Sequence, residues 1–167
     1  MRLVTFSRQG GAPQPGVLLQ DGAVAPLSGL GYADVISVLA GGPAALARIT
    51  DFVSAGPGTA APDTVTLLAP IPRPPKLICV GLNYRVHAME TNMEIPTVPT
   101  IFNKFPNVVI APGQPIVLPS NSTRPDYEAE FAFVIGTGGR RIPAESWQEH
   151  VAGYTIVNDV SARDFQL

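Results

Sequence analysis

The first part of the chain has two patterns of hydrophobic and polar residues, that of strands followed by that of helices. Residues 2–7 alternate as a strand does, and residues 15–27 have the pattern of two short strands joined by an Asp-Gly turn. Apolar residues then recur every three or four positions over 34–39 and 44–53. This spacing predicts two short helices after the strands.

A proline-rich stretch at residues 70–75 separates this first segment from a second one. We place a domain boundary near residue 70, with a small N-terminal domain at 1–70 and a second domain at 71–167. In the second domain the pattern predicts strands over 76–80, 97–102, 116–118, 126–135 and 154–158, and helices over 85–90 and 144–151.

The composition excludes several classes of protein. Hydrophobic residues make up 46% and charged residues 14%, which favours a folded core over disorder. The net charge is −2 and no basic cluster exists, so we expect no nucleic-acid partner. No apolar run is long enough to span a membrane, and no signal peptide is evident. The single cysteine, Cys79, fits a reducing compartment and reads as a core residue, so we expect a cytoplasmic protein.

The last residues of the chain have the pattern of a helix start. Ser161 precedes Asp164 by three positions, as an N-cap precedes an acid in a capping box. Only Phe165, Gln166 and Leu167 follow, and one turn of helix is not stable alone. We therefore expect further polypeptide, either a continuation or a separate chain, to pack on this half.

Two glutamates share one face of the predicted strand at 126–135. Glu128 and Glu130 would stand about 6–7 Å apart, while the alternate positions, including Phe131 and Phe133, form an apolar face that we expect to be buried. Adjacent carboxylates that lose hydration repel each other, and a dication would relieve both costs. A solvated edge with two harmless glutamates is the alternative.

A third acid, Asp159, follows the predicted strand at 154–158. Functional side chains concentrate in the loops that follow strands. Three carboxylates without clustered histidine or cysteine favour Mg²⁺ or Mn²⁺ over zinc.

His87 and Glu90 lie three positions apart and would share one face of the helix predicted at 85–90. A carboxylate beside an imidazole raises its basicity, as the activation of water requires. A surface histidine with an unrelated glutamate neighbour is the alternative. His150 reads as a surface residue.

Several stretches taken together resemble the metal-dependent fumarylacetoacetate hydrolase family. They cover residues 76–167 in order, and each alone is a weak signal. They are the run 76–84 with His87 and Glu90, the run 102–104 ending in Lys104, the Glu-x-Glu at 128–130, and the run 153–164 followed by Gln166.

The resemblance implies an α+β fold with a mixed β-roll catalytic domain, preceded by a small β-rich N-terminal domain, in a homodimer. It implies Mg²⁺ or Mn²⁺ on Glu128, Glu130 and Asp159. The substrate would be a small-molecule 2-oxo or β-dicarbonyl acid, fumarylacetoacetate- or acylpyruvate-like. Water activated by His87 and Glu90 would cleave a C–C bond and release a metal-stabilised enolate. Substrate contacts would come from Gln166, Arg163 and Lys104.

Other functions fit the same resemblance. Relatives decarboxylate, isomerise or dehydrate related 2-oxo or hydroxy acids, and a non-catalytic fragment or subunit that needs a second chain is a further alternative. Leu82 stands where some relatives carry arginine. A further lysine and a threonine-bearing glycine-rich loop of the family would lie beyond Leu167.

Overall fold

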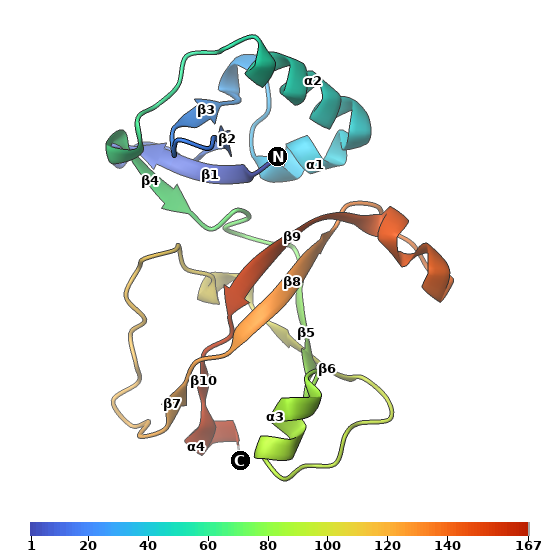
Figure 1. Cartoon of the computed structure of the whole chain (residues 1–167). Helices are drawn as coiled ribbons and strands as arrows, with labels where there is room; N and C mark the ends of the chain where they lie inside the picture. Colours follow the sequence, from blue (N-terminus) through green and yellow to red (C-terminus); the bar gives the residue numbers. More distant parts are fainter. Residues whose placement is uncertain (167) are drawn as a thin grey trace.

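The first 68 residues supply every strand of the largest sheet. A computed structural model describes residues 1–166. The sheet is antiparallel with the order β3-β2-β1-β4, and two helices cover it (Figure 1). Its elements are β1 Leu3–Arg8, β2 Gln14–Leu18, β3 Val24–Pro26, η1 Ser28–Leu30, α1 Val35–Ala40, α2 Gly42–Ser54, η2 Pro62–Thr64 and β4 Val65–Leu68.

The core of this first unit lies between the sheet and the two helices. Val17, Ala25, Leu27, Val38 and Ile49 form one buried cluster. The alternation in the strands and the helical spacing each place an apolar face toward it, as the sequence predicts. The structure also contains β4, which the sequence analysis missed.

The second part of the chain has three two-stranded antiparallel ribbons, pairing β5 with β6, β7 with β10, and β8 with β9 (Figure 1). Its elements are β5 Leu77–Gly81, α3 Arg85–Glu90, β6 Thr100–Lys104, η3 Pro106–Val108, β7 Pro125–Asp126, β8 Ala129–Ile135, η4 Ala144–His150, β9 Val151–Asn158, β10 Ser161–Ala162 and α4 Arg163–Gln166. The chain therefore has a mixed α/β fold, and no helix in its described part could cross a membrane.

Four predictions for the second part are wrong. Residues 116–118 form no strand, and 144–150 form a 3₁₀ helix in place of an α-helix. The strand predicted at 126–135 is interrupted at Tyr127 and Glu128. Ser161 is no helix cap, because it pairs with Asp126 in the β7–β10 ribbon.

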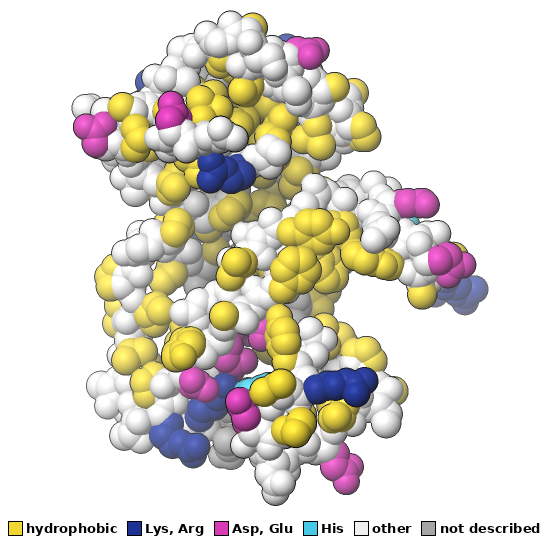
Figure 2. Space-filling view, in the orientation of Figure 1, with side chains coloured by type: hydrophobic (Ala, Val, Ile, Leu, Met, Phe, Trp, Pro, Cys, Tyr) yellow, Lys and Arg dark blue, Asp and Glu magenta, His cyan; other side chains and the backbone are white. Residues whose placement is uncertain are grey.

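The two faces of β8 are also reversed from the prediction. Phe131 is 61% and Phe133 is 53% exposed, whereas Ala132 and Val134 on the opposite face are half-buried. On the aromatic face, the ring of Phe131 stacks on Tyr154 of its own ribbon, and the ring of Phe133 lies 6.5 Å from that of Trp147 in η4. Figure 2 shows hydrophobic side chains at the surface over this ribbon.

Candidate metal and substrate site

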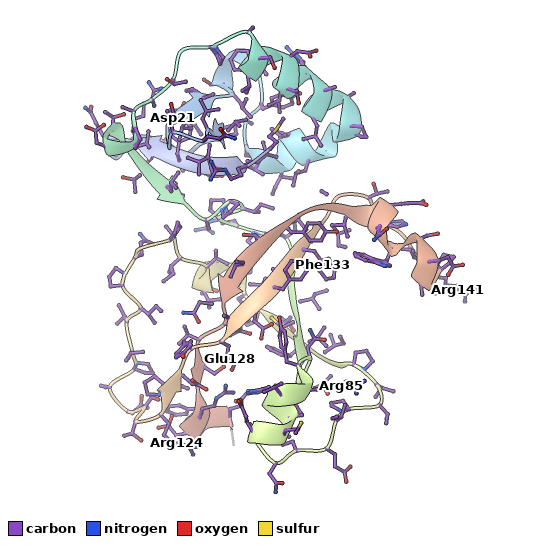
Figure 3. The ribbon with its side chains drawn as sticks, viewed as in Figure 1. Asp21, Arg85, Arg124, Glu128, Phe133 and Arg141 are labelled. Carbon is purple, nitrogen blue, oxygen red and sulfur yellow. The ribbon has the colours of Figure 1, made fainter. Side chains whose placement is uncertain are left out.

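The break between β7 and β8 brings two of the predicted acids together. The backbone N–H of Asp159 donates to the carbonyl of Glu128 at 2.8 Å, and the N–H of Glu128 donates to Oδ1 of Asn158 at 3.1 Å. These bonds fasten the β7–β8 break to the β9–β10 break. Figure 3 labels Glu128 at this junction, where acidic and basic side chains gather in Figure 2.

The carboxylate of Glu128 is held by Arg163 and Ser161. Arg163 Nη2 lies 2.5 Å from Glu128 Oε1, and the Ser161 hydroxyl donates to the same oxygen at 2.9 Å. Arg163 also donates to Asp126 Oδ2 through Nε at 3.0 Å and Nη2 at 2.8 Å. Its hydrogen bonds hold the pKa of Asp126 below the usual range. The guanidinium therefore joins two acids in a fixed fork.

Asp159 is the most enclosed of the three predicted ligands. Its side chain is 11% exposed, and Oδ1 forms an ion pair with the ammonium of Lys104. The same oxygen is buried and is met by no hydrogen bond of acceptable geometry among the described residues. The Lys104 ammonium balances the charge of this oxygen, but the oxygen accepts no well-aligned hydrogen bond. A buried carboxylate oxygen of this kind is suited to bind a cation.

Glu130 completes the acid cluster. Burial raises the pKa of Glu130, and the negative charges of Glu128 and Asp159 raise it further, while His87 and the Tyr84 hydroxyl act in the opposite direction. Glu128 and Asp159 are therefore close enough to act on the carboxylate of Glu130. His87 acts on the same carboxylate from α3.

These side chains fit a hard divalent cation in their chemistry. All three predicted ligands present carboxylate oxygens, and one of these, Asp159 Oδ1, is buried against the ammonium of Lys104. In their present rotamers, no three acidic, histidine or cysteine side chains of residues 1–166 converge to hold an ion. Arg163 and Lys104 supply the compensating positive charge instead.

His87 and Glu90 are not joined in the structure. His87 is half-buried, Glu90 is exposed, and no hydrogen bond or ion pair between them occurs within the described chain. His87 lowers the pKa of Glu130 and of Asp126, so it lies near the acid cluster. The role of Glu90 stays a prediction. His150 lies elsewhere, with Nδ1 2.8 Å from the carbonyl of Thr137.

The three predicted substrate contacts lie together. Lys104, Ser161 and Gln166 line one open hollow beside α4, and Arg163 Nη1 donates to Gln166 Oε1 at 2.6 Å. A negatively charged ligand in this hollow would meet an ammonium, a hydroxyl and an amide. Whether these residues bind substrate stays a prediction.

Sequence analysis missed several residues that build the site. Ser161 holds Glu128, Asn158 holds the Glu128 backbone, and the Tyr84 hydroxyl accepts from the N–H of Phe131 at 3.2 Å. Cys79 lies beside Asp159, and burial followed by the charge of Asp159 raises the pKa of its thiol. Alternation after Asp159 could have placed Ser161 on the acid face, whereas the Tyr84 contact joins residues 47 positions apart and leaves no local signal.

Comparison with known proteins shows which family the second part of the chain matches. The family description "Fumarylacetoacetate (FAA) hydrolase C-terminal" matches residues 76–167, more than half of the chain. The mitochondrial oxaloacetate tautomerase fahd2 of Xenopus laevis is 39% identical over 182 residues, which cover 100% of this chain and 54% of that protein. The chain thus spans about half the length of this relative.

Solved structures give the same result for the fold. Fumarylacetoacetate hydrolase from Exiguobacterium antarcticum matches with a TM-score of 0.78 and 31% identity, covering 99% of this chain and 58% of that one. Maleylpyruvate hydrolase from Sphingobium sp. SYK-6, solved with manganese(II) and pyruvate, matches with a TM-score of 0.79 and 25% identity, covering 98% and 60%. The expected fold similarity is confirmed, but the closed roll is not seen in residues 1–166.

One expectation is contradicted by these comparisons. The sequence suggested a cytoplasmic protein, whereas the curated relatives include mitochondrial oxaloacetate tautomerases of Xenopus laevis and other animals. Composition and a single cysteine only indicate a reducing environment, which does not distinguish between compartments. The cytoplasmic prediction is therefore wrong.

Proposed function

Because the chain belongs to the fumarylacetoacetate hydrolase family, we propose that it supplies the acid site of a divalent-metal-dependent enzyme that interconverts the keto and enol forms of a 2-oxo dicarboxylic acid such as oxaloacetate. One observation carries this proposal: the Asp159 N–H donates to the Glu128 carbonyl at 2.8 Å, which places two of the three acids side by side, and Asp159 Oδ1 is buried. The name of the Xenopus laevis relative supports the choice of reaction.

Glu128, Glu130 and Asp159 are the residues that would hold Mg²⁺ or Mn²⁺. When bound, the cation would supply a Lewis acid for the oxygens of the 2-oxo acid. Glu130 has no cationic partner among the described residues, whereas Glu128 is paired with Arg163 and accepts from Ser161. The chain's own task is then to hold the substrate carboxylates and to move one proton.

Arg163, Gln166 and Lys104 are suited to bind the substrate carboxylates. Lys104 and Gln166 line the hollow next to α4, and Arg163, fixed by Asp126, donates to Gln166 through Nη1. The Lys104 ammonium and the Gln166 amide can donate hydrogen bonds to a carboxylate, and the charge of Arg163 favours an anion beside them. This would orient the C2 carbonyl and the C3–H bond of the substrate relative to His87.

His87 would carry the proton in tautomerisation. Its neutral ring nitrogen takes the proton from C3, the C–H electron pair becomes the C2=C3 double bond, and the carbonyl electron pair moves to O2. The imidazolium then returns the proton to O2, which gives the enol. The step needs no water and no oxidant.

Cleavage of a C–C bond is the second candidate function, and the partial exposure of the His87 side chain supports it. His87 is only half-buried and has no Glu90 partner, so water can reach its ring. His87 would then take a proton from water that attacks the carbonyl. Two of the matching solved structures are of hydrolases of this family.

Two statements about assembly are also proposals. The curated relative is about twice as long as this chain, and the aromatic face of β8 is uncovered. We expect further polypeptide of the same protein to cover this face. Homodimer formation stays a prediction.

The test uses both histidines of the chain. Ketonisation of the oxaloacetate enol is followed by its ultraviolet absorbance, with Mg²⁺, with Mn²⁺ and with chelator. His87→Gln should lose the metal-dependent rate, while His150→Gln, the matched control, should keep it. Parallel assays of acylpyruvate cleavage and of carbon dioxide release from oxaloacetate distinguish the alternatives. No metal-dependent rate on any of these acids would overturn the proposal.

A further inference from the structure

Lys104 occupies an unusual position for a lysine. It is the last residue of β6, opposite Leu77 of β5, and its side chain is only 28% exposed. Its ammonium forms an ion pair with Asp159 Oδ1. An exposed pair of this type would be worth little, but this carboxylate oxygen is buried.

The ammonium balances a charge that otherwise has no compensation. Asp159 Oδ1 has no hydrogen-bond donor of good geometry, and Glu128 and Glu130 add negative charge nearby. A buried carboxylate without a cation is strongly unfavourable. Lys104 thus stands at the oxygen where a divalent cation would have to bind.

We infer that Lys104 is an exchangeable counter-ion, which neutralises Asp159 when no divalent cation is bound and leaves this carboxylate when one binds. The inference rests on the metal site of the proposed function. It adds that metal binding frees an ammonium into the hollow lined by Ser161 and Gln166. The freed charge would then be available to a substrate carboxylate.

The second cation of the site is not suited to this exchange. Arg163 donates to Asp126 through two nitrogens, contacts Glu128 and donates to Gln166, so its planar fork is fixed on several sides. Lys104 makes one ion pair, and its charge is a point on a flexible four-carbon stem. Moving Lys104 breaks one contact, whereas moving Arg163 would break four.

Exchange also couples the two ligands. If metal binding releases Lys104 toward the hollow, a dicarboxylate that pairs with the released ammonium must in turn favour the metal-bound state. Each ligand would therefore tighten the binding of the other. An ammonium that stayed on Asp159 in both states would give no such coupling through Lys104.

The first experiment measures Mn²⁺ binding by titration calorimetry in the whole protein, for the wild type, Lys104→Met and Lys76→Met. Lys76 is the only other lysine of the chain and is exposed, so it is the matched control. Loss of the competing ammonium should tighten Mn²⁺ binding about tenfold in Lys104→Met, since like charges a few ångströms apart repel at this scale. The metal-free Lys104→Met protein should also melt at a lower temperature and gain more from Mn²⁺.

The outcomes separate this inference from the proposed function. If the wild type binds no divalent cation, both are overturned. If the wild type binds Mn²⁺ and Lys104→Met binds it equally or more weakly, only the exchange is overturned.

A second measurement needs no variant, which matters if Lys104→Met does not fold. Acetylation of the wild type with acetic anhydride, read by peptide mass spectrometry, compares Lys104 with Lys76 in one molecule. The ratio of Lys104 to Lys76 modification should rise several-fold when Mn²⁺ is added. An unchanged or lower ratio in Mn²⁺-saturated protein would overturn the exchange.

Discussion

The two parts of the chain bury their apolar side chains to very different degrees. All of the largest fully buried side chains lie in the first unit: Phe6, Leu27, Ile49, Val24, Val38 and Pro15. In the described residues from 76 onward, the buried hydrophobic residues are Ala88 and Ala111, while aromatic residues such as Phe131, Tyr154 and Phe165 are more than half exposed.

The residues that form the hydrophobic core and the residues of the candidate site therefore lie in different parts of the chain. The first unit has a closed core and no acid cluster, whereas the second has the acid cluster and almost no closed core. The ribbons around this cluster are held by polar contacts, including the hydrogen bond to the Glu128 carbonyl and those donated by Arg163. The exposed aromatic face of β8 is the surface on which we propose that further polypeptide packs.

The largest effect should come from the core of the first unit. Phe6→Ala should cost about 3–5 kcal/mol of unfolding free energy, because it leaves a cavity beneath the sheet. Phe133→Ala removes the same ring from the exposed face of β8 and should cost about 1 kcal/mol or less. Urea unfolding followed by circular dichroism measures both, and equal costs would contradict the comparison.

The next effect concerns the acid cluster. Glu130→Gln removes one charge with little change in volume, and turnover with Mn²⁺ should fall about 100-fold or more, close to 2.7 kcal/mol of transition-state stabilisation. The fold should survive, because the loss of a charge that is repelled by Glu128 and Asp159 does not weaken the metal-free protein.

Glu145→Gln is the matched control for this variant, since Glu145 is exposed on η4. It should leave turnover unchanged. Full activity of Glu130→Gln at saturating Mn²⁺ would count against a catalytic metal, and unfolding of this variant would show that Glu130 is structural.

A smaller effect should follow from the loss of one hydroxyl. Tyr84 ties the segment before α3 to β8, because its oxygen accepts from the Phe131 N–H and its hydroxyl stabilises the charged form of Glu130. Tyr84→Phe should weaken Mn²⁺ binding and lower turnover about tenfold, which corresponds to about 1.4 kcal/mol. Tyr127→Phe, at a side chain that is 79% exposed, should change neither quantity.

The sequence predicted well those features that depend on neighbours along the chain. The helix at residues 85–90 was predicted with its observed bounds, and the strands of the first unit to within one or two residues in most cases. Local spacing determines a helix or a hairpin almost alone. The grouping of Glu128, Glu130 and Asp159 was also expected, from the three acids and the family resemblance, and the pairing of β8 with β9 brings Asp159 beside Glu128.

Features that depend on residues far away in the sequence could not be predicted from local spacing. Alternation showed that the faces of β8 differ, but it did not show that Phe131 and Phe133 would lie uncovered. Ser161 has the pattern of a helix cap, yet pairing with Asp126 and the hydrogen bond to Glu128 decide its conformation. The sequence suggested that Lys104 contacts the substrate, and only the structure shows the ion pair between its ammonium and Asp159.

The smallest effect tests a polar contact that holds α4 in place. The Thr123 N–H and the Ser122 hydroxyl donate to the carboxylate of Asp164, each at 2.7 Å. These hydrogen bonds, that of the Thr123 N–H first, hold the pKa of Asp164 below its usual range. A carboxylate with a lowered folded pKa contributes stability above its unfolded pKa of about 3.9, and this is lost as the pH falls through the folded value. The contact should therefore be intact at neutral pH and break only below about pH 3.9.

Asp164→Asn removes the titrating group while keeping the size of the side chain. In the wild type, the amide proton signal of Thr123 in an NMR titration should move upfield as the pH falls below about 3.9. In Asp164→Asn the Thr123 amide signal should lie upfield at neutral pH and should not shift as the pH falls. The free energy of unfolding should change little, because the contact is exposed. Asp63→Asn, in the first unit, should leave the Thr123 step intact. A Thr123 signal that titrates identically in Asp164→Asn would show that another acid holds this turn, and the second part of the chain would then depend on fewer polar contacts than its structure displays.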